Sequence, residues 1–256
     1  MSVRCRLMTY NIAHGRGLSL YQGFVSPSKL RRNLKAIGNF VREAEVDILA
    51  MQEVDLDSHW NRRVNLLAVI QSVTGHPFGI IGINNRRTGP KVLAYGNGLL
   101  SKFPILKWEN NPFGGAKLGE KGFLYAELKI NGSIVPVVVL HLDFRSTERR
   151  IRQLSKLVDY IRALPPDPKR TPPIFCGDFN CGPRSAEDAV RQLDEALRKV
   201  GDYRIYPVSD PTFPSLWPRQ KIDFIFTPSS FHVRFCEVPK IHMSDHRPVL
   251  MEFEIS

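Results

Sequence analysis

A short carboxylate and a short amide stand two residues apart in the stretch Phe175-Cys176-Gly177-Asp178-Phe179-Asn180. Apolar residues of strand character precede this stretch, and a turn containing Gly and Pro follows it. Residues two apart in an extended chain point to the same side, so Asp178 and Asn180 can converge at the rim of a sheet. Because Asp and Asn also end strands and start turns, this pair alone does not establish a catalytic site.

Other polar residues share the placement of Asp178, at or near the end of an apolar segment. They are Asn11, Glu53, Asn97, His141, Asp223, Asp245 and His246. The strand ends of a layered sheet share one rim, where residues distant in sequence can meet. Singly, most of them also have a structural interpretation: Asn97 is flanked by two glycines, as in a turn, and His141 lies in an apolar run typical of a core strand. A purely structural explanation would have to be correct at every one of these positions at once. A shared functional site is therefore favoured.

The donor atoms in this set predict a hard divalent cation. Glu53, Asp178 and Asp245 supply carboxylate oxygens, and Asn11 and Asn180 supply amide oxygens. Such oxygens suit Mg²⁺, with Mn²⁺ as an alternative, in a site that keeps several waters. The two histidines stand at no spacing typical of zinc and are better suited to carry protons or to donate to a phosphate oxygen.

Composition and charge restrict the class of partner. The chain has 256 residues, of which 43% are hydrophobic, enough for one large unit or two small domains. A net charge of +11 favours nucleic acid, a phospholipid surface or a phosphorylated small molecule as partner. The four scattered cysteines are typical of free thiols in a reducing compartment. We read no leader and no membrane-spanning run, and we expect a cytoplasmic monomer.

Apolar residues at helical spacing predict four helices. Ser26 and Pro27 begin the first, the second covers Arg62 to Val73, and Ser146 caps the third. The stretch Ser185-Ala186-Glu187-Asp188 resembles a capping box and precedes the fourth.

Strand-like segments separate these helices, and Asn131-Gly132 predicts a tight hairpin turn between two of them. Loops are expected over residues 84–91, 113–122 and 202–221. A single domain over residues 1–256, made of two packed sheets flanked by helices, fits this order best. The same alternation would also allow an open parallel sheet.

Seven segments together resemble the endonuclease/exonuclease/phosphatase superfamily, in its order and spacing over residues 7–254. They are Thr9-Tyr10-Asn11, Gln52-Glu53-Val54, Gly96-Asn97-Gly98-Leu99-Leu100-Ser101, His141-Leu142, Gly177-Asp178-Phe179-Asn180, Ile222-Asp223-Phe224-Ile225-Phe226 and Ser244-Asp245-His246. The resemblance implies an α+β fold, a four-layered αββα sandwich of two mixed β-sheets flanked by helices. It also implies Mg²⁺-dependent cleavage of a phosphoester by water.

The resemblance also implies which residues bind the metal and which residue positions the attacking water. It implies that Glu53 is the main metal ligand, with Asn11 and Asp245 nearby, directly or through water. Asp178 would then orient or deprotonate the attacking water.

The remaining residues of the resemblance concern the phosphate and the proton. Asn97 and Asn180 would hold phosphate oxygens. His141, and His246 oriented by Asp223 or Asp245, would stabilise the charged transition state or assist proton transfer. In-line attack on a phosphodiester needs a positioned nucleophile, charge neutralisation and help for the leaving group, which agrees with these roles.

Two features bear on the substrate. His141-Leu142 stands where the abasic-site endonuclease branch carries a Tyr-x-Pro-Asn type stretch, and it looks more like the deoxyribonuclease, sphingomyelinase and inositol-phosphatase branches. Several basic residues expected near the rim could grip a nucleic-acid backbone, namely Arg16, Arg86, Arg87, Lys91 and Arg145. We therefore predict a phosphodiesterase that acts on nucleic acid, a nuclease.

Phospholipid head groups and inositol phosphates are the alternative substrates. Phe213, Trp217 and Phe231 could form a lipid-facing edge, but core packing of these rings is favoured. The alternative from another class is a non-catalytic module that binds nucleic acid or a protein on the same fold.

Overall fold

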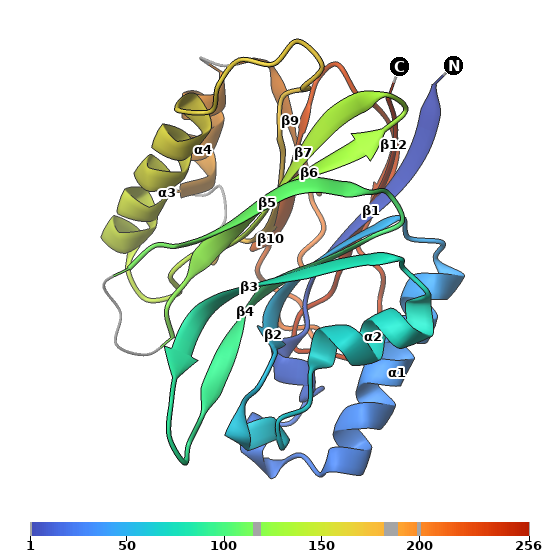
Figure 1. Ribbon diagram of the computed structural model, residues 1–256, viewed down its shortest axis with the longest axis vertical. Coiled ribbons are helices and arrows are strands. Elements are labelled where there is room, and N and C mark those ends of the chain that lie inside the picture. The colour runs from blue at the N-terminus through green and yellow to red at the C-terminus, as the bar shows by residue number, and fades with distance from the viewer. Residues whose placement is uncertain (1, 115–118, 182–188, 199–200, 256) are drawn as a thin grey trace.

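Two mixed six-stranded sheets pack face to face in the computed structural model, which describes residues 2–114, 119–181, 189–198 and 201–255 (Figure 1). Sheet A has the strand order β11-β12-β1-β2-β4-β3. Its strands are β1 (Val3–Asn11), β2 (Ile48–Asp55), β3 (Phe78–Arg87), β4 (Leu93–Ser101), β11 (His232–Glu237) and β12 (Val249–Ile255).

Sheet B has the strand order β5-β6-β7-β8-β10-β9. Its strands are β5 (Ile105–Pro112), β6 (Gly122–Ile130), β7 (Ser133–His141), β8 (Ile174–Asp178), β9 (Tyr203–Tyr206) and β10 (Asp223–Pro228). Each sheet contains one parallel pair, β1 with β2 and β7 with β8, and the other described pairs are antiparallel.

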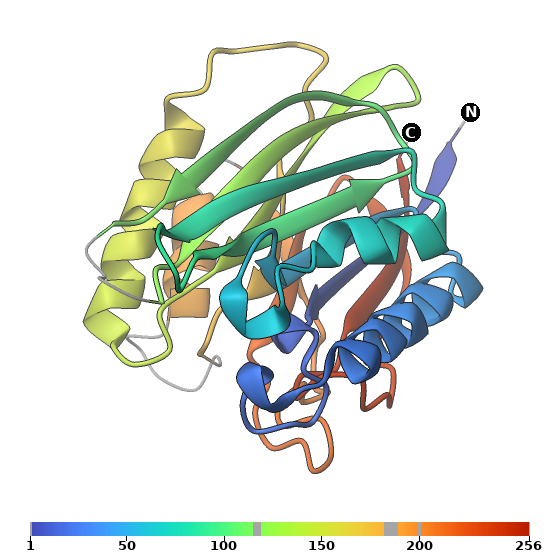
Figure 2. The ribbon, with the colours of Figure 1, turned by 60° about the horizontal axis from the view of Figure 1, so that its bottom comes forward.

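Helices cover the outer face of each sheet, which makes four layers (Figure 2). They are α1 (Pro27–Glu43), α2 (Leu66–Thr74), α3 (Thr147–Arg162) and α4 (Ala189–Leu197). In the described residues, short 3₁₀ turns lie at Ala13–Gly15, Gln22–Phe24 and His59–Asn61. One apolar cluster fills the space between the sheets, a second joins α3 and α4 to sheet B, and a third joins α1 and α2 to sheet A. The predicted αββα sandwich is thus confirmed, and the open parallel sheet is excluded.

Several predicted element boundaries are wrong. The second helix begins at Leu66 rather than Arg62, because the Asn65 side chain caps it by accepting a hydrogen bond from the Ala68 N–H at 3.0 Å. Strand β3 runs to Arg87 through part of the loop expected at 84–91, and β9 lies within the loop expected at 202–221. The caps at Ser26 and Ser146 are confirmed, whereas the stretch 185–188 lies outside the described residues.

The tight contact between β7 and β8 depends on Gly177. A Cβ at this position would lie 1.9 Å from the carbonyl oxygen of Leu140, and its φ of +145° is rarely adopted by other residues. The neighbour of Gly177 is Asp178, which pairs with His141 across the two strands.

Among the described residues, no helix has both the length and the apolar composition needed to cross a bilayer.

Candidate active site

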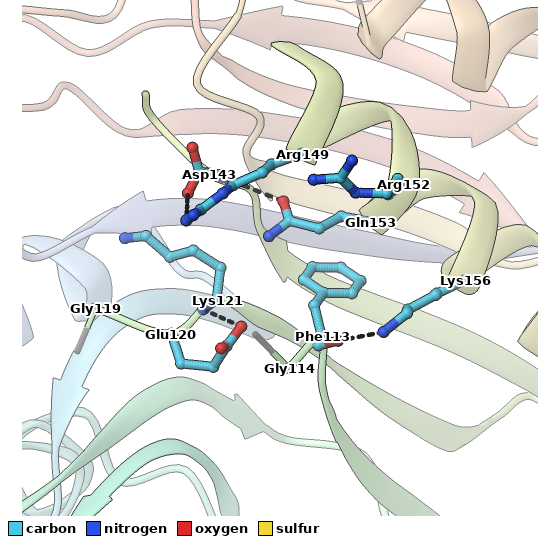
Figure 3. Close-up of a pocket in the computed structure, with 10 residues that line it drawn as sticks. All are labelled: Phe113, Gly114, Gly119, Glu120, Lys121, Asp143, Arg149, Arg152, Gln153 and Lys156. Atoms are coloured by element: carbon cyan, nitrogen blue, oxygen red, sulfur yellow. Dashed lines mark hydrogen bonds and ion pairs between the residues drawn. The ribbon is translucent and has the colours of Figure 1, made fainter. Parts of the chain in front are cut away.

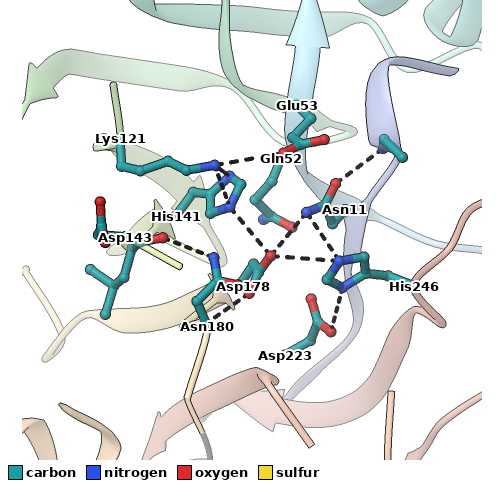
Figure 4. Close-up of polar contacts among 12 residues, drawn as sticks. Asn11, Gln52, Glu53, Lys121, His141, Asp143, Asp178, Asn180, Asp223 and His246 are labelled. Carbon is teal, nitrogen blue, oxygen red and sulfur yellow. Dashed lines mark hydrogen bonds and ion pairs between the residues drawn. The ribbon is translucent and has the colours of Figure 1, made fainter. Parts of the chain in front are cut away.

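Most of the predicted polar residues meet where strands of both sheets end (Figure 4). Asn11 ends β1 in sheet A, and His246 lies three residues before β12. From sheet B come His141 and Asp178, the last residues of β7 and β8. Asp223, the first residue of β10, pairs with Asp178 in the antiparallel register. Strand register within each sheet therefore places these side chains, and packing of the two sheets brings them together.

Asp178 is the centre of this group. Its Oδ2 accepts a hydrogen bond from Asn11 Nδ2 at 2.9 Å and lies 3.3 Å from His141 Nε2 and 3.7 Å from His246 Nε2. Its Oδ1 accepts a hydrogen bond from the Asn180 N–H at 2.9 Å. The carboxylate is 1% exposed, so groups from four chain segments surround a single buried acid.

A second buried acid fixes the orientation of His246. Asp223 Oδ2 lies 2.9 Å from His246 Nδ1, which leaves Nε2 facing Asp178 and Asn11. The ring of Phe213 packs on the imidazole with 4.9 Å between ring centroids. Of the two predicted partners of His246, Asp223 makes this contact, whereas Asp245 contacts Arg16.

A β-bulge places Glu53. Met51 pairs with Gly98 and Val54 with Gly96, so both Gln52 and Glu53 stand opposite Asn97. Glu53 has a φ of +57°, a conformation that is uncommon for residues other than glycine. The extra residue turns its carboxylate toward the rim while Gln52 stays buried against Thr9.

Two residues outside the predicted set, Lys121 and His14, stand beside Glu53. Lys121 Nζ lies 3.6 Å from Glu53 Oε1 and 2.8 Å from His141 Nε2. His14 Nε2 lies 3.6 Å from Glu53 Oε2, and its Nδ1 lies 2.9 Å from Asp55 Oδ2. Lys121 falls in the stretch 113–122, for which a surface loop was expected, yet its side chain is only 12% exposed.

A signal for Lys121 was present in the sequence. The turn at Asn131-Gly132 fixes the register of the hairpin, and counting back from it pairs Gly122 with His141. Lys121 therefore stands one residue from the partner of a candidate catalytic histidine. No comparable signal marks His14, because its position depends on the 3₁₀ turn at Ala13–Gly15.

Asn180 and Asn97 differ in what they present to the site. Asn180 Nδ2 donates to the Leu142 carbonyl at 2.9 Å, which leaves its second amide hydrogen for another acceptor. Both amide hydrogens of Asn97 are used, toward the carbonyls of Gly122 at 2.9 Å and Val139 at 3.2 Å. The buried Oδ1 of Asn97 has no hydrogen-bond partner, so Asn97 presents an acceptor and joins β4 to β6 and β7.

Four residues of the site region have a positive φ, namely Ala13, His14, Glu53 and Asn180. They make up half of the eight described non-glycine residues with this conformation. Each such residue costs on the order of 1 kcal/mol or more, and strained residues cluster where surrounding structure must hold a functional geometry.

Burial and neighbouring charges shift the pKa values of the site. Burial raises the pKa of Asp178, and Asp223 adds to this effect against the opposing charge of His246. Burial would lower the pKa of His246, but Asp223 and Asp178 outweigh it and raise the pKa. Burial and then the Lys121 ammonium hold the pKa of His141 well below its ordinary value. One histidine is thus kept charged and the other neutral.

Glu53 is the carboxylate best suited to a metal ion. Burial alone would raise its pKa, yet the charges of His14 and Lys121 prevail and hold it well below its ordinary value. Both cations lie 3.6 Å from its oxygens, beyond hydrogen-bond length, so the oxygens keep capacity for a ligand.

A second set of residues has the spacing of a metal site. Ligand atoms of Asp178, Asp223 and His246 lie within 4.8 Å of one another, and all three residues are buried. This trio shares no member with the predicted metal ligands Glu53, Asn11 and Asp245.

One known protein family matches the part of the chain that contains Asn11 through His246. The model of the Endonuclease/Exonuclease/phosphatase family matches residues 8–246. The chain belongs to this family. Within the curated proteins, YbhP of Escherichia coli strain K12 is 27% identical over 169 residues, which cover 63% of this chain and 63% of YbhP. The chain thus spans less than two thirds of the relative it matches.

Several solved structures share the fold over nearly the whole chain. The Beutenbergia cavernae family member has a TM-score of 0.76 at 21% identity, over 99% of this chain and 72% of its own. Mannosyl-6-phosphatase of Bacteroides thetaiotaomicron has a TM-score of 0.72 at 17% identity, over 97% of this chain and 99% of its own. D. rerio TDP2, solved with a single-strand DNA product, has a TM-score of 0.66 at 16% identity, over 98% of each chain.

The predicted basic and aromatic residues are only partly gathered at the site. Arg16 contacts Asp245 and so borders the site. Arg86 and Arg87 are the last residues of β3 and pair with Ala94 and Leu93, three and four residues before Asn97 on β4. Core packing is confirmed for Phe231, which is 3% exposed, but is wrong for Trp217, which is 73% exposed. Trp217 lies in the irregular segment 207–222, which leaves its ring exposed.

Proposed function

We propose that this family member is a Mg²⁺-dependent phosphodiesterase that cleaves nucleic acid with an activated water. The observation that carries the proposal is the setting of Asp178 Oδ2, which is contacted by Asn11, His141 and His246 from both sheets. A buried acid held by two histidines and an amide is an arrangement for proton transfer and charge stabilisation.

In this proposal Asp178 orients the attacking water and takes its proton. The Asn11 amide and the Asn180 N–H hold the two carboxylate oxygens in place, so the acid keeps one orientation. The free amide hydrogen of Asn180 and the side chain of Lys121 then donate to oxygens of the phosphate. Asn97 supports this position by holding β4, β6 and β7 together rather than by donating to the phosphate.

The histidines differ in role because they differ in charge. His246, held by Asp223, presents a protonated Nε2 that can stabilise the negative charge of the transition state or protonate the leaving oxygen. His141 is neutral and contacts Lys121 and Asp178, which suits it to orient the phosphate and the acid.

Glu53 is the proposed main ligand of Mg²⁺, with Asn11 and Asp245 nearby, and Mn²⁺ is an alternative ion. The bulge directs the Glu53 carboxylate to the rim, and its oxygens are not hydrogen-bonded by the adjacent cations. The ion would neutralise charge on the phosphate group. Asp245 is engaged by Arg16, so we expect it to act through a water.

A substrate panel tests this function. Single- and double-stranded DNA, RNA, bis-p-nitrophenyl phosphate, sphingomyelin and inositol phosphates are each incubated with Mg²⁺ or with EDTA. We expect cleavage of a nucleic acid that EDTA abolishes and that falls roughly 10²–10⁴-fold in Asp178→Asn. The exposed acid Asp159 on α3 supplies the matched control, Asp159→Asn, which should keep full activity.

Other outcomes of the substrate panel would contradict the proposal. If neither EDTA nor Asp178→Asn lowers the turnover rate, the proposed chemistry is wrong. Cleavage of none of the substrates, combined with binding of DNA or RNA, would favour a non-catalytic module.

The second candidate function is cleavage of phospholipid head groups or inositol phosphates. The exposed side chains of Leu20, Phe24 and Trp217, which are 96%, 81% and 73% exposed, favour contact with an apolar surface. Turnover of sphingomyelin or inositol phosphates, with nucleic acids left intact, would establish it.

A further inference from the structure

A cavity of about 220 Å³ adjoins the site on the side of Lys121 (Figure 3). We call it the basic pocket; it is the cavity lined by Lys121, Arg149, Arg152, Gln153 and Lys156 together with Phe113, Glu120 and Asp143. Three of the four cations come from α3 and the fourth, Lys121, from the segment that leads into β6. Four cationic side chains thus surround a pocket with two acids in its lining.

The two acids of the basic pocket are already bonded to main-chain groups. Asp143 Oδ1 accepts hydrogen bonds from the N–H groups of Arg145 and Ser146, both at 2.8 Å. Its Oδ2 lies 3.7 Å from Arg149. Glu120 Oε1 accepts a hydrogen bond from the Lys121 N–H at 3.1 Å. These acids hold the backbone of the pocket and offset only part of its positive charge.

The cations of α3 lie on one helix face. Arg149, Arg152 and Lys156 are three and four residues apart, a spacing at which like charges destabilise a helix by about 0.2–0.5 kcal/mol per pair. Lys156 donates to the main-chain carbonyl of Phe113, an acceptor without charge. Glu148, four residues before Arg152, pairs with it and offsets part of this repulsion, and an anion in the pocket would offset more of it.

Gln153 adds an oriented donor to the charges. Its side-chain oxygen accepts a hydrogen bond from the Asp143 N–H at 2.8 Å, so its amide nitrogen is the atom that remains for the pocket (Figure 3). The residue is 8% exposed. Guanidinium groups with a buried amide donor form a binding site for a multi-oxygen anion such as phosphate.

Lys121 connects the basic pocket to the active site. Its ammonium reaches His141 Nε2 and Glu53 Oε1, and the same residue lines the pocket. A group bound among the α3 cations would therefore lie next to a phosphate held at His141.

We propose that the basic pocket binds a second phosphate of the substrate, next to the phosphate that is cleaved. The inference rests on the proposed phosphodiesterase function and makes it more specific: the preferred substrate carries at least two phosphates. In a nucleic acid this group is the neighbouring phosphate of the strand, and in a small substrate it is a terminal phosphate.

Matched dinucleotides test the pocket by kinetics. The values of kcat/KM for TpT are compared with those for pTpT and TpTp, which differ from TpT only by one terminal phosphate. We expect one of these phosphates to raise kcat/KM at least about tenfold, mainly through KM. The double variant Arg149→Gln/Lys156→Gln should lose most of that ratio. Arg162→Gln, which removes an exposed cation of α3 outside the pocket, should keep it.

A binding measurement needs no turnover. Inorganic phosphate is titrated into the isotope-labelled protein, and amide shifts are followed at Gly114, Gly119 and Gln153, which line the pocket. We expect saturable shifts that weaken at least about tenfold in the double variant but not in Arg162→Gln.

The two measurements separate the pocket from the proposed function. Shifts at these amides, without cleavage of any dinucleotide or of the DNA and RNA of the substrate panel, would leave the pocket standing and refute cleavage of nucleic acid. An absence of shifts in the wild-type protein, or an equal kcat/KM ratio in the wild type and the double variant, would overturn the pocket.

Discussion

His246 Nδ1 lies 2.9 Å from Asp223 Oδ2, and this contact turns the other ring nitrogen toward Asp178. The histidine precedes β12 in sheet A and the acid begins β10 in sheet B. A contact between the two sheets therefore decides which nitrogen of the ring faces Asp178.

Replacement of this acid should disable His246 without removing it. In Asp223→Asn we expect kcat on bis-p-nitrophenyl phosphate to fall roughly 10²–10⁴-fold, with KM little changed, because the ring loses its orientation and charge. The double variant Asp223→Asn/His246→Gln should be no slower than His246→Gln alone. If the fold-loss in kcat of the double variant equals the product of the losses of the two single variants, Asp223 does not act through His246. His232→Gln, on the exposed start of β11, is the control.

Metal binding should be measurable through stability. Saturating Mg²⁺ should raise the Tm by several degrees, since a ligand at 100 Kd stabilises by about 2.7 kcal/mol and each kcal/mol moves the Tm of such a chain by about 2–4 °C. Glu53→Gln should abolish most of this rise in thermal unfolding at constant ionic strength. Glu45→Gln, whose side chain is 75% exposed, should retain it.

The same measurement distinguishes the two candidate metal sites. If the rise survives in Glu53→Gln and disappears in His246→Gln, the ion is held by the trio of Asp178, Asp223 and His246 instead.

A histidine far from the site should make stability depend on pH. Burial and then Lys102 lower the pKa of His76 from its ordinary 6.5. Below about pH 6.5 His76 therefore binds a proton in the unfolded chain but not in the folded chain. The neutral His76 therefore contributes its full share of the free energy of unfolding above about pH 6.5. This share is lost as the pH falls toward the pKa of His76 in the folded protein, at up to about 1.4 kcal/mol per pH unit.

His76→Gln should remove this dependence. Urea unfolding of wild type and variant at pH 7.5, 6.5 and 5.5 should give a free-energy difference that shifts in favour of the variant as the pH falls. His232→Gln, which removes an exposed imidazole, should show a constant difference. A constant difference for His76→Gln as well would show that this histidine protonates equally in both states.

Gly177 should be intolerant of a side chain. In Gly177→Ala the added carbon meets the Leu140 carbonyl, and we expect a loss of on the order of 2–5 kcal/mol in urea unfolding, from steric overlap and backbone strain together. Gly132→Ala has a positive φ but open space around the new carbon, so it should lose only about 1–2 kcal/mol. Equal losses in the two variants would mean that the β7–β8 contact relaxes without cost.

Much of the site was predictable because its residues stand at strand ends. The apolar runs before Asn11, His141 and Asp178 identify three of these ends, and the hairpin turn at Asn131-Gly132 fixes the register that brings Lys121 beside them. Helix α3 was predictable from its cap and from its apolar spacing. Local patterns carry these features because turn chemistry and side-chain periodicity act over a few residues.

Other features depend on contacts between distant segments. The bulge at Glu53 arises only when β2 pairs with β4, and the hydrogen bond from Asn11 to Asp178 spans 167 residues of sequence. Both amide hydrogens of Asn97 are taken by carbonyls of two other strands. Strand β5 escaped prediction because residues such as Asn110, Asn111 and Pro112 have poor strand propensity.

The position of β12 between β1 and β11 has a consequence for local opening of the protein. β12 pairs with β1, which Asn11 ends, and His246 precedes β12 by three residues. Strand β1 also pairs with β2, so β12 can separate from β1 while the rest of sheet A stays paired. We expect such an opening to move His246 away from Asn11 and Asp178, so the attachment of a single strand controls whether the site is complete.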